Sequence, residues 1–382
     1  MTIEVYNSVG GAAFFQRLLH EWEMAGVQVI PYQAISESDY RARRGVLGRI
    51  ALRWRMYPGY AWTCWRGARR GRTQASVRVA TTNPFFMPAL VARATRGQGT
   101  TINFLYDLYP EALIQAGKIA PGSWLARRCT TITRFALREC AATVFLGDRL
   151  RAYAETTHGP ARRAVVIPVG ADGRPFKDTP PQLLAMEKRP RILYSGLMGR
   201  MHDSDTLAAL WAEAETTGVT WTFQASGAGY ARLRKTAGTR PDVMWGAALP
   251  DTEWQQTMKQ AQVALVTIAP GAERVVMPSK TYSALVAGQA ILAICPQASD
   301  LADLVVRHDC GWVVEPGDHA GLKHALNDIA QNPGKLLAKR RNAFVAGHRH
   351  YDMGVVAETW MKLFTELQAA GRHTMTLSGR NH

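Results

Sequence analysis

The chain has 382 residues, a hydrophobic content of 47% and a formal net charge of +16. The apolar content excludes a disordered protein. Because a single hydrophobic core rarely serves more than about 250–300 residues, we expect two globular domains. The chain contains no run of about 18 apolar residues, so we expect no membrane-spanning helix. Its first residues lack the basic and apolar regions of a signal peptide, so we expect no such peptide. The five cysteines include no C-x-x-C pair. We therefore expect no zinc site and no disulfide framework, and a cytoplasmic location.

The positive charge is concentrated in the first half of the chain. Residues 1–185 contain 25 Lys and Arg against 12 Asp and Glu, whereas residues 186–382 contain 21 against 18. This asymmetry predicts that the first half meets an acidic partner, such as a membrane surface, a nucleic acid or another polyanion.

The chain begins with a strand, a glycine pair, a helix and a second strand. The strand covers residues 3–6, Gly10 and Gly11 follow it, the helix covers 12–25, and the second strand covers 27–30. The two glycines let a ligand approach the backbone, but the segment lacks the G-x-G-x-x-G pattern of dinucleotide-binding proteins. Glycines that only allow close packing would give the same pattern.

Residues 41–72 form the most unusual segment, with ten Arg, no Asp or Glu, and several interspersed aromatic residues. A helix over 46–56 places apolar residues on one side and basic residues on another, which suits an anionic bilayer surface. A solvated face with packed aromatic residues is the alternative. No recognised nucleic-acid module is present, so we expect no nucleic-acid partner. The residues predicted to form the membrane or acceptor surface are Arg49, Arg53, Trp54 and Arg55.

A second candidate region follows a strand predicted over 101–106. Asp107 comes directly after this strand and Glu111 lies four residues further on. Open α/β sheets bind ligands at the carboxyl ends of their strands, so Asp107 is a candidate site residue, whereas Glu111 favours the start of a helix. The other elements predicted in this half are strands over 77–80, 142–146 and 164–168 and helices over 86–96, 124–140 and 148–156. The helix over 124–140 carries four more Arg that extend the basic surface.

A proline-containing segment, residues 173–185, is predicted to link the two domains. The second half then repeats the alternation of strands and helices, which predicts a second parallel sheet. Its expected strands are 191–195, 221–225, 243–246, 264–268, 290–294 and the edge strand 310–314. Its expected helices are 205–216, 253–260, a helix after Pro278, 319–330 and a final helix over 355–367.

Two loops of this second half have the composition of anion-binding sites. Gly196, Gly199 and Arg200 follow the first strand, and Ser279 and Lys280 open a helix after a later strand. Exposed N–H groups at a helix start, together with positive side chains, favour a phosphate. An ordinary crossover with an exposed lysine is the alternative interpretation.

Taken together, these segments resemble a family 4 glycosyltransferase of the GT-B fold, in the branch that builds bacterial O-antigen and exopolysaccharide repeats. The chain has Y-S-G-L-M-G-R-M-H-D over 194–203, similar to the family's Y-x-G-N-L-G-R-x-H-D, and P-S-K with A-G over 278–288. Residues 107–111, 168–172 with Phe176, 310–311 and 316–318 match further landmarks, so the resemblance covers about residues 1–365. There are departures: Ser283 replaces the family's second Glu, Glu273 is only a loose counterpart of the first, Tyr106 precedes Asp107 where the family has His, and Ala290 replaces a Pro.

The resemblance implies two Rossmann-like domains that face each other across a cleft, with a C-terminal helix that returns to the first domain. The expected boundaries are 1–172 with the helix 352–368 for the acceptor domain, 186–350 for the nucleotide-sugar domain, and a mobile tail over 369–382. The implied reaction is a retaining transfer from a UDP- or GDP-linked sugar to a lipid-linked or other saccharide acceptor. It takes place at the cytoplasmic face of the membrane, in cell-surface polysaccharide synthesis.

The resemblance also implies roles for individual residues. Lys280, Arg200 and Asp107 are the expected catalytic residues, with no metal and no cofactor, since the two cations stabilise the leaving diphosphate. The expected donor-binding residues are Gly10, Gly11, Gly196, Gly199, His202, Gly227, Leu249, Glu273, Pro278, Ser279, Tyr282 and Ser283. The alternatives are a nucleotide-sugar epimerase of the same fold and a non-catalytic protein that binds polyanions through residues 41–72.

Overall fold

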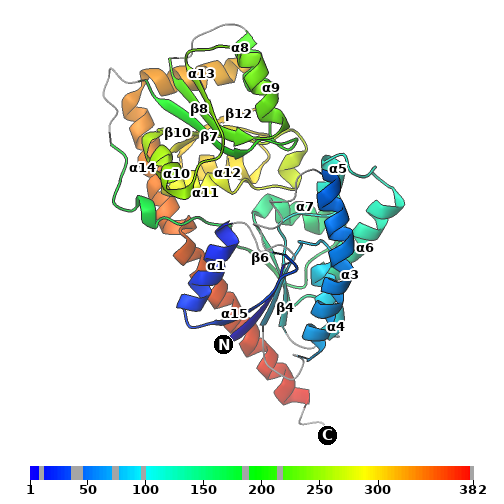
Figure 1. Cartoon of the computed structure of the whole chain (residues 1–382). Helices are drawn as coiled ribbons and strands as arrows, with labels where there is room; N and C mark the ends of the chain where they lie inside the picture. Colours follow the sequence, from blue (N-terminus) through cyan, green and yellow to red (C-terminus); the bar gives the residue numbers. More distant parts are fainter. Residues whose placement is uncertain are drawn as a thin grey trace. The chain divides into compact units, whose positions relative to one another are not determined.

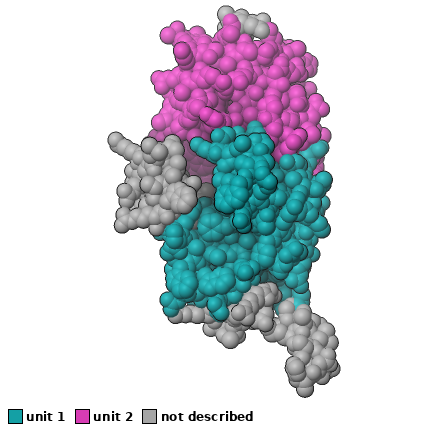
Figure 2. Space-filling view, turned by 90° about the vertical axis from the view of Figure 1, so that its right-hand side faces the viewer, with its two compact units in different colours: residues 1–168, 356–382 teal, residues 169–355 magenta. Residues whose placement is uncertain are grey.

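The computed structural model describes residues 1–7, 13–35, 46–70, 77–95, 100–182, 189–212 and 218–378. The chain divides into two compact units (Figure 2). Unit 1 consists of Met1–Pro168 together with Val356–His382, and unit 2 consists of Val169–Val355. Within the described residues, none of the helices combines the length and the apolarity that crossing a bilayer requires.

Unit 1 is built on a six-stranded parallel sheet with the order β2-β1-β3-β4-β5-β6. Its strands are β1 (Thr2–Tyr6), β2 (Gln28–Tyr32), β3 (Val77–Thr81), β4 (Thr100–Phe104), β5 (Ala142–Phe145) and β6 (Ala164–Val166). The central strands are almost fully buried, because helices cover both faces of the sheet. This burial explains why they read in the sequence as short apolar runs.

The helices of unit 1 form two layers (Figure 1). They are α1 (Ala13–Met24), α3 (Val46–Arg70), α4 (Met87–Thr95), α5 (Glu111–Gln115), α6 (Trp124–Glu139), α7 (Asp148–His158) and most of α15 (Met353–Ser378). On one face of the sheet, the Trp360 ring of α15 packs against Trp22 of α1 and Phe104 of β4, with centroid distances of 5.4 and 4.8 Å. On the other face, Tyr6 and Ala80 share a cluster with residues of α3 and α4. The C-terminal helix therefore returns to unit 1, as expected.

Helix α3 is much longer than the sequence pattern predicts. It continues from Val46 to Arg70 through Pro58, where we expected it to end near Met56. A proline inside a helix costs about 3 kcal/mol. Tertiary packing outweighs that cost: Tyr60, Cys64 and Ala68, spaced four residues apart, are all buried, and the Tyr60 hydroxyl donates to the Tyr32 carbonyl at 2.8 Å.

Unit 2 has a second six-stranded parallel sheet, with the order β12-β11-β10-β7-β8-β9. Its strands are β7 (Arg191–Leu197), β8 (Thr220–Ser226), β9 (Val243–Gly246), β10 (Val263–Thr267), β11 (Ala290–Ile294) and β12 (Gly311–Val314). Its helices are α8 (Asp205–Ala212), α9 (Ala228–Ala237), α10 (Asp251–Gln260), α11 (Lys280–Val286), α12 (Asp300–Arg307), α13 (His319–Gln331) and α14 (Pro333–Ala346), with short helices η2 (Arg174–Phe176), η3 (Ala272–Arg274) and η4 (Gly347–Tyr351). Both halves thus have the Rossmann-like α/β architecture that the alternation of elements predicts.

The segment expected to be a linker is part of unit 2. It contains η2, and the Gly173 amide just before this helix donates to the Asp352 carboxylate at 3.0 Å. Residues 171 and 352 also form a parallel bridge. At the other end of the chain, α15 extends to Ser378, so most of the segment expected to be a mobile tail is helical.

Candidate functional site

The candidate site lies where the loop after β7 meets the start of α11. Strands β7 and β10 are parallel neighbours, so their carboxyl ends lie at the same edge of the sheet, and the chain passes from β10 through η3 to α11. The Lys280 ammonium donates to the Leu197 carbonyl at 3.4 Å and lies 3.7 Å from the centroid of the Tyr194 ring. The Tyr194 hydroxyl also donates to the Leu197 carbonyl, at 2.8 Å. Two loops that are more than 80 residues apart in the sequence thus form one positively charged site.

Gly196 has a backbone conformation that favours glycine, and it lies beside this cation. Its φ is +109°, a conformation that side chains with a Cβ rarely adopt, and a Cβ there would be 4.0 Å from the Lys280 Nζ atom. The backbone of β7 therefore approaches Lys280 closely.

The electrostatics of Lys280 favour an anionic ligand. Among the described residues, no carboxylate forms an ion pair with it; its neighbours are a carbonyl and an aromatic ring. Burial lowers its pKa from 10.5 to about 7, because a charged amine loses hydration there. A bound phosphate would supply the missing negative charge and raise this pKa again.

His202 is a neutral hydrogen-bond donor in the same loop. Its Nδ1 accepts from the Gly199 amide at 3.2 Å, which places the ring proton on Nε2. Burial and the nearby charge of Lys280 lower the pKa of His202 to about 4. The ring thus stays uncharged at neutral pH while its Nε2–H remains available to a ligand.

A cavity of about 370 Å³ adjoins these groups. It is lined by Leu193, Ser195, Gly196, Leu197, His202, Trp254, Met258, Ala264, Leu265, Val266, Pro278, Ser279, Lys280, Ser283, Ala284 and Gln289. Several of its polar groups are held in place: the Trp254 indole donates to the Ser195 hydroxyl at 3.1 Å, and Gln289 donates to the Met258 carbonyl at 2.7 Å. The Gln289 Oε1 atom is buried and has no hydrogen-bond partner. This is a mostly apolar cavity with a few fixed polar groups, as small-molecule sites usually are.

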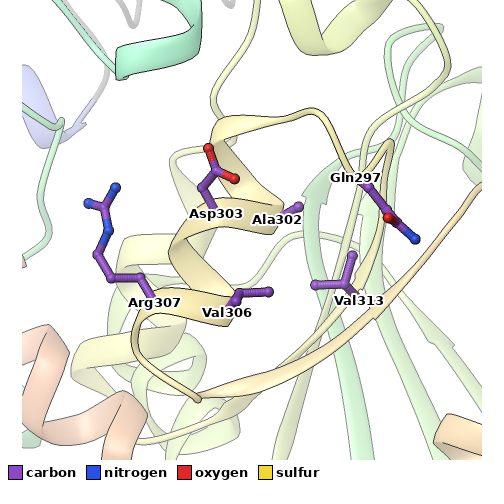
Figure 3. A pocket seen from close by; sticks show the side chains of 6 residues that line it. All are labelled: Gln297, Ala302, Asp303, Val306, Arg307 and Val313. Atoms are coloured by element: carbon purple, nitrogen blue, oxygen red, sulfur yellow. The ribbon is translucent and has the colours of Figure 1, made fainter.

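A larger cavity, of about 540 Å³, lies elsewhere in unit 2, between α12 and the edge strand β12 (Figure 3). Val306 and Val313 approach it from these two elements, and Arg307 points away from them. It contains none of the glycines, serines or the lysine of the site described above. Size alone therefore does not identify the functional cavity.

Other predicted residues of unit 2 lie around this site without lining the cavity. Arg200 is exposed on the turn between Gly199 and His202. Gly227 has a φ of +111°, and a Cβ there would be 2.5 Å from the Met198 carbonyl oxygen, so the loop after β8 lies against the loop after β7. Leu249 is half-buried before α10.

Glu273 and Tyr282 also lie outside the cavity. Glu273, in η3, is paired with Arg274 at 3.4 Å, and its Oε2 atom is buried without a hydrogen-bond partner. Tyr282 is buried with its ring 5.2 Å from that of Tyr351, which makes it a core residue in this structure.

Asp107 belongs to unit 1, directly after β4. The Thr82 hydroxyl accepts from the backbone amides of Tyr106 and Asp107, at 3.1 and 3.2 Å, and this fixes the turn. Burial raises the pKa of Asp107 to about 6. Glu111 pairs instead with His158, at 2.9 Å.

Several predicted residues lie outside what the structure describes. Gly10 and Gly11 are outside the described residues, and the side chains of Arg49, Arg53, Trp54 and Arg55 are likewise not described, although their backbone lies in α3. The sequence analysis missed three residues that the structure brings to the site: Tyr194, Trp254 and Gln289. Tyr194 was in a motif but had no assigned role, and the other two carry no local signal.

Comparisons with solved structures extend over nearly the whole chain. Sucrose-phosphate synthase from Thermosynechococcus elongatus aligns over 97% of this chain and 100% of its own, with a TM-score of 0.70 at 13% identity. Anabaena Alr3699/HepE, in complex with UDP and glucose, aligns over 96% and 100%, with a TM-score of 0.70 at 15% identity. The E. coli trehalose-6-phosphate structure bound with UDP-2-fluoro glucose aligns over 96% and 98%, with a TM-score of 0.62 at 13% identity. The chain has the GT-B fold.

Sequence comparisons give a weaker but consistent signal. No protein-family model matches the chain. A probable glycosyltransferase of Pseudomonas aeruginosa, WbjE, is 22% identical over 240 residues, which is 59% of this chain and 59% of that protein. The match to this relative thus spans less than two thirds of its length.

Proposed function

We propose that the chain is a retaining glycosyltransferase of family 4, which moves a sugar from a nucleotide-diphosphate donor to a saccharide acceptor. The observation that carries this proposal is the Lys280 ammonium, which lies over the Tyr194 ring at the edge of a cavity and has no carboxylate partner among the described residues. The GT-B fold, the UDP and UDP-glucose complexes of HepE and the similarity to a probable glycosyltransferase support it.

In this proposal the cations of unit 2 stabilise the leaving group. As the bond from sugar to diphosphate breaks, negative charge develops on the phosphate oxygens, and a preformed ammonium group lowers the energy of that state. Lys280 supplies this charge, the Nε2–H of His202 donates a hydrogen bond, and Arg200 reaches the diphosphate from its exposed turn. No metal ion is required for this neutralisation. The departing phosphate takes the proton of the acceptor hydroxyl.

The polar groups of the cavity and the surrounding loops bind the rest of the donor. Ser283, where the family has Glu, accepts a hydrogen bond from a donor hydroxyl. Gly227 and Leu249 hold the base. Asp107 lines the sugar or acceptor side, where its carboxylate accepts a hydrogen bond from a hydroxyl group while the departing phosphate acts as the base.

The acceptor is a lipid-linked saccharide at the cytoplasmic face of the membrane, and the product is a cell-surface polysaccharide such as O-antigen or exopolysaccharide. The exposed face of α3 supports this part of the proposal. Trp62 is 62% exposed, and Arg66 and Arg69 follow it at helical spacing on the same face. A basic face with an exposed indole suits an anionic bilayer surface.

The test is a transfer assay combined with direct binding measurements. Isothermal titration with UDP, GDP and UDP-glucose, followed by product analysis with candidate acceptors, is expected to show diphosphate binding and a product whose new glycosidic bond keeps the donor's anomeric configuration. Release of an altered nucleotide sugar without any acceptor would establish an epimerase instead. A protein that binds polyanions but none of these nucleotides would refute the proposal.

A further inference from the structure

The start of α6 is a second exposed apolar surface with a strongly basic surround. Trp124 is 68% exposed and Leu125 is 42% exposed, although both are large apolar residues. The loop before them, residues 117–122, is also largely exposed and includes Ala120 and Pro121. Removing such side chains from water lowers the free energy, so an exposed cluster of them marks an interaction surface.

The loop holds these side chains outward by its own hydrogen bonds. Ser123 caps α6 by accepting from the Ala126 amide at 3.3 Å, and the Lys118 amide donates to the Leu113 carbonyl at 2.8 Å. The Arg127 guanidinium donates to the Gly122 carbonyl at 3.0 Å. Trp124 and Leu125 are thus presented by a hydrogen-bonded turn and the first turn of a helix.

The charged residues of the segment between Glu111 and Glu139 all have the same sign. Residues 112–138 contain five Lys and Arg and no Asp or Glu. Three of these cations, Lys118, Arg127 and Arg128, are exposed beside the apolar side chains, and the Arg128 guanidinium lies 5.4 Å from the centroid of the Trp124 ring. An exposed indole next to Leu, surrounded by cations, is complementary to an anionic headgroup layer above an apolar interior.

We propose that the tip formed by residues 117–128 inserts into an anionic bilayer and that Trp124 and Leu125 enter the interface while Lys118, Arg127 and Arg128 contact lipid phosphates. This anchor is separate from the basic face of α3, and it does not depend on sugar transfer, so it stands or falls by membrane binding alone. Since α4 packs against both α3 and α6, the two surfaces belong to the same helical layer of unit 1 (Figure 1).

Site-specific labelling tests the insertion directly. All five native cysteines are buried, so a Trp124→Cys variant can be labelled at that position with an environment-sensitive dye. An Arg138→Cys variant is the matched control, because it is exposed on the same helix about 21 Å further along. Interfacial insertion reaches only about 5–10 Å, so we expect a blue shift and brighter emission at position 124 and none at 138. The probes are vesicles of phosphatidylcholine with and without phosphatidylglycerol, and the shift requires the anionic lipid.

Binding measurements complete the test. Replacing Arg127 and Arg128 by Gln is expected to weaken partition into anionic vesicles by about fivefold per residue, in a salt-dependent way. The Trp124→Ala/Leu125→Ala variant is expected to lose at least as much, with an unchanged far-UV circular dichroism spectrum and unfolding temperature as evidence of folding. The inference is overturned if the label at 124 stays in water on bound vesicles, or if these variants bind like the wild type. It is equally overturned if the same substitutions leave vesicle binding unchanged but convert a dimer into a monomer in solution. That result would mean that a second copy of the chain covers the tip.

Discussion

Replacing Lys280 by Met is the most informative perturbation, because it keeps the length of the side chain and removes its charge. The ammonium lies between the Leu197 carbonyl and the Tyr194 ring, and no described carboxylate compensates it. Loss of one preformed charge-stabilising donor typically lowers kcat by a factor of about 100 to 1,000. We expect that loss here for sugar transfer.

The same substitution is expected to stabilise the unliganded protein. Since the folded state lowers the pKa of Lys280 from 10.5 to about 7, the unfolded chain binds more protons between these values and stability rises with pH across that window. Below pH 7 the wild type carries the full penalty of the buried charge. At 1.36 kcal/mol per pKa unit, the upper limit of that penalty is about 5 kcal/mol, and solvent access to the half-buried side chain reduces it to about 1–3 kcal/mol. Lys280→Met removes it.

The Lys280→Met variant is therefore expected to lose catalytic activity and to gain thermal stability. Transfer of labelled sugar is expected to fall about 100-fold or more, while thermal unfolding near pH 6 moves to a higher temperature, and this gain disappears toward pH 10. Lys259→Met is the matched control, because that exposed lysine lies 5.9 Å from the Phe176 ring and outside the cavity. A Lys280→Met enzyme with wild-type turnover would remove Lys280 from the reaction, and a variant that is less stable at pH 6 would refute the account of its electrostatics.

Four further outcomes follow from the same geometry. UDP affinity is expected to fall as pH rises above 7, because the ammonium of Lys280 then loses its proton in the free protein. In titrations from pH 7 to 9, Lys280→Arg should flatten this pH dependence. If the variant shows the same pH dependence as the wild type, Lys280 is not the titrating group. Ser283→Glu restores the family's carboxylate at the cavity, so UDP should bind about tenfold tighter through a charge-assisted hydrogen bond, and no gain would argue against a contact between residue 283 and a donor hydroxyl. Gly227→Ala adds a Cβ that would lie 2.5 Å from the Met198 carbonyl oxygen and should lower the unfolding temperature of unit 2 by several degrees. Gly238 also has a positive φ but has open space around it, so Gly238→Ala should lower the unfolding temperature less. Turnover is expected to survive treatment with EDTA, and a complete, magnesium-reversible loss would show that a metal shares the charge neutralisation.

Much of the fold was predictable because buried parallel strands appear as short apolar runs separated by helices. The strand over 290–294 was predicted to the residue, and the edge position of β12 was also correct. Helices α9, α12 and α14 were missed, since each is short or has a mixed surface pattern. The helix predicted to end near Met56 continues to Arg70, because local propensity contains no information about the packing that offsets Pro58.

The candidate site was predictable only where a motif placed charged and glycine residues at strand ends. Gly196, His202 and Lys280 were found in this way, and the structure brings all three to one cavity. The contribution of Tyr194 was not foreseeable, because a ring inside an apolar strand gives no indication that a lysine more than 80 residues later will lie over it. Gln289 was missed for a similar reason, since only its burial without a partner for Oε1 reveals it.

The path of α15 determines the order in which the chain can become folded. This helix starts at Met353, after every strand of unit 2, yet its Trp360 covers Trp22 and Phe104 in unit 1. During synthesis, unit 2 can therefore complete its core while unit 1 still exposes an aromatic surface near the beginning of the chain. A chain that stops before Trp360 would therefore have a second unit able to fold and a first unit whose Trp22 and Phe104 lack their cover, and we expect such a chain to associate through that exposed aromatic surface.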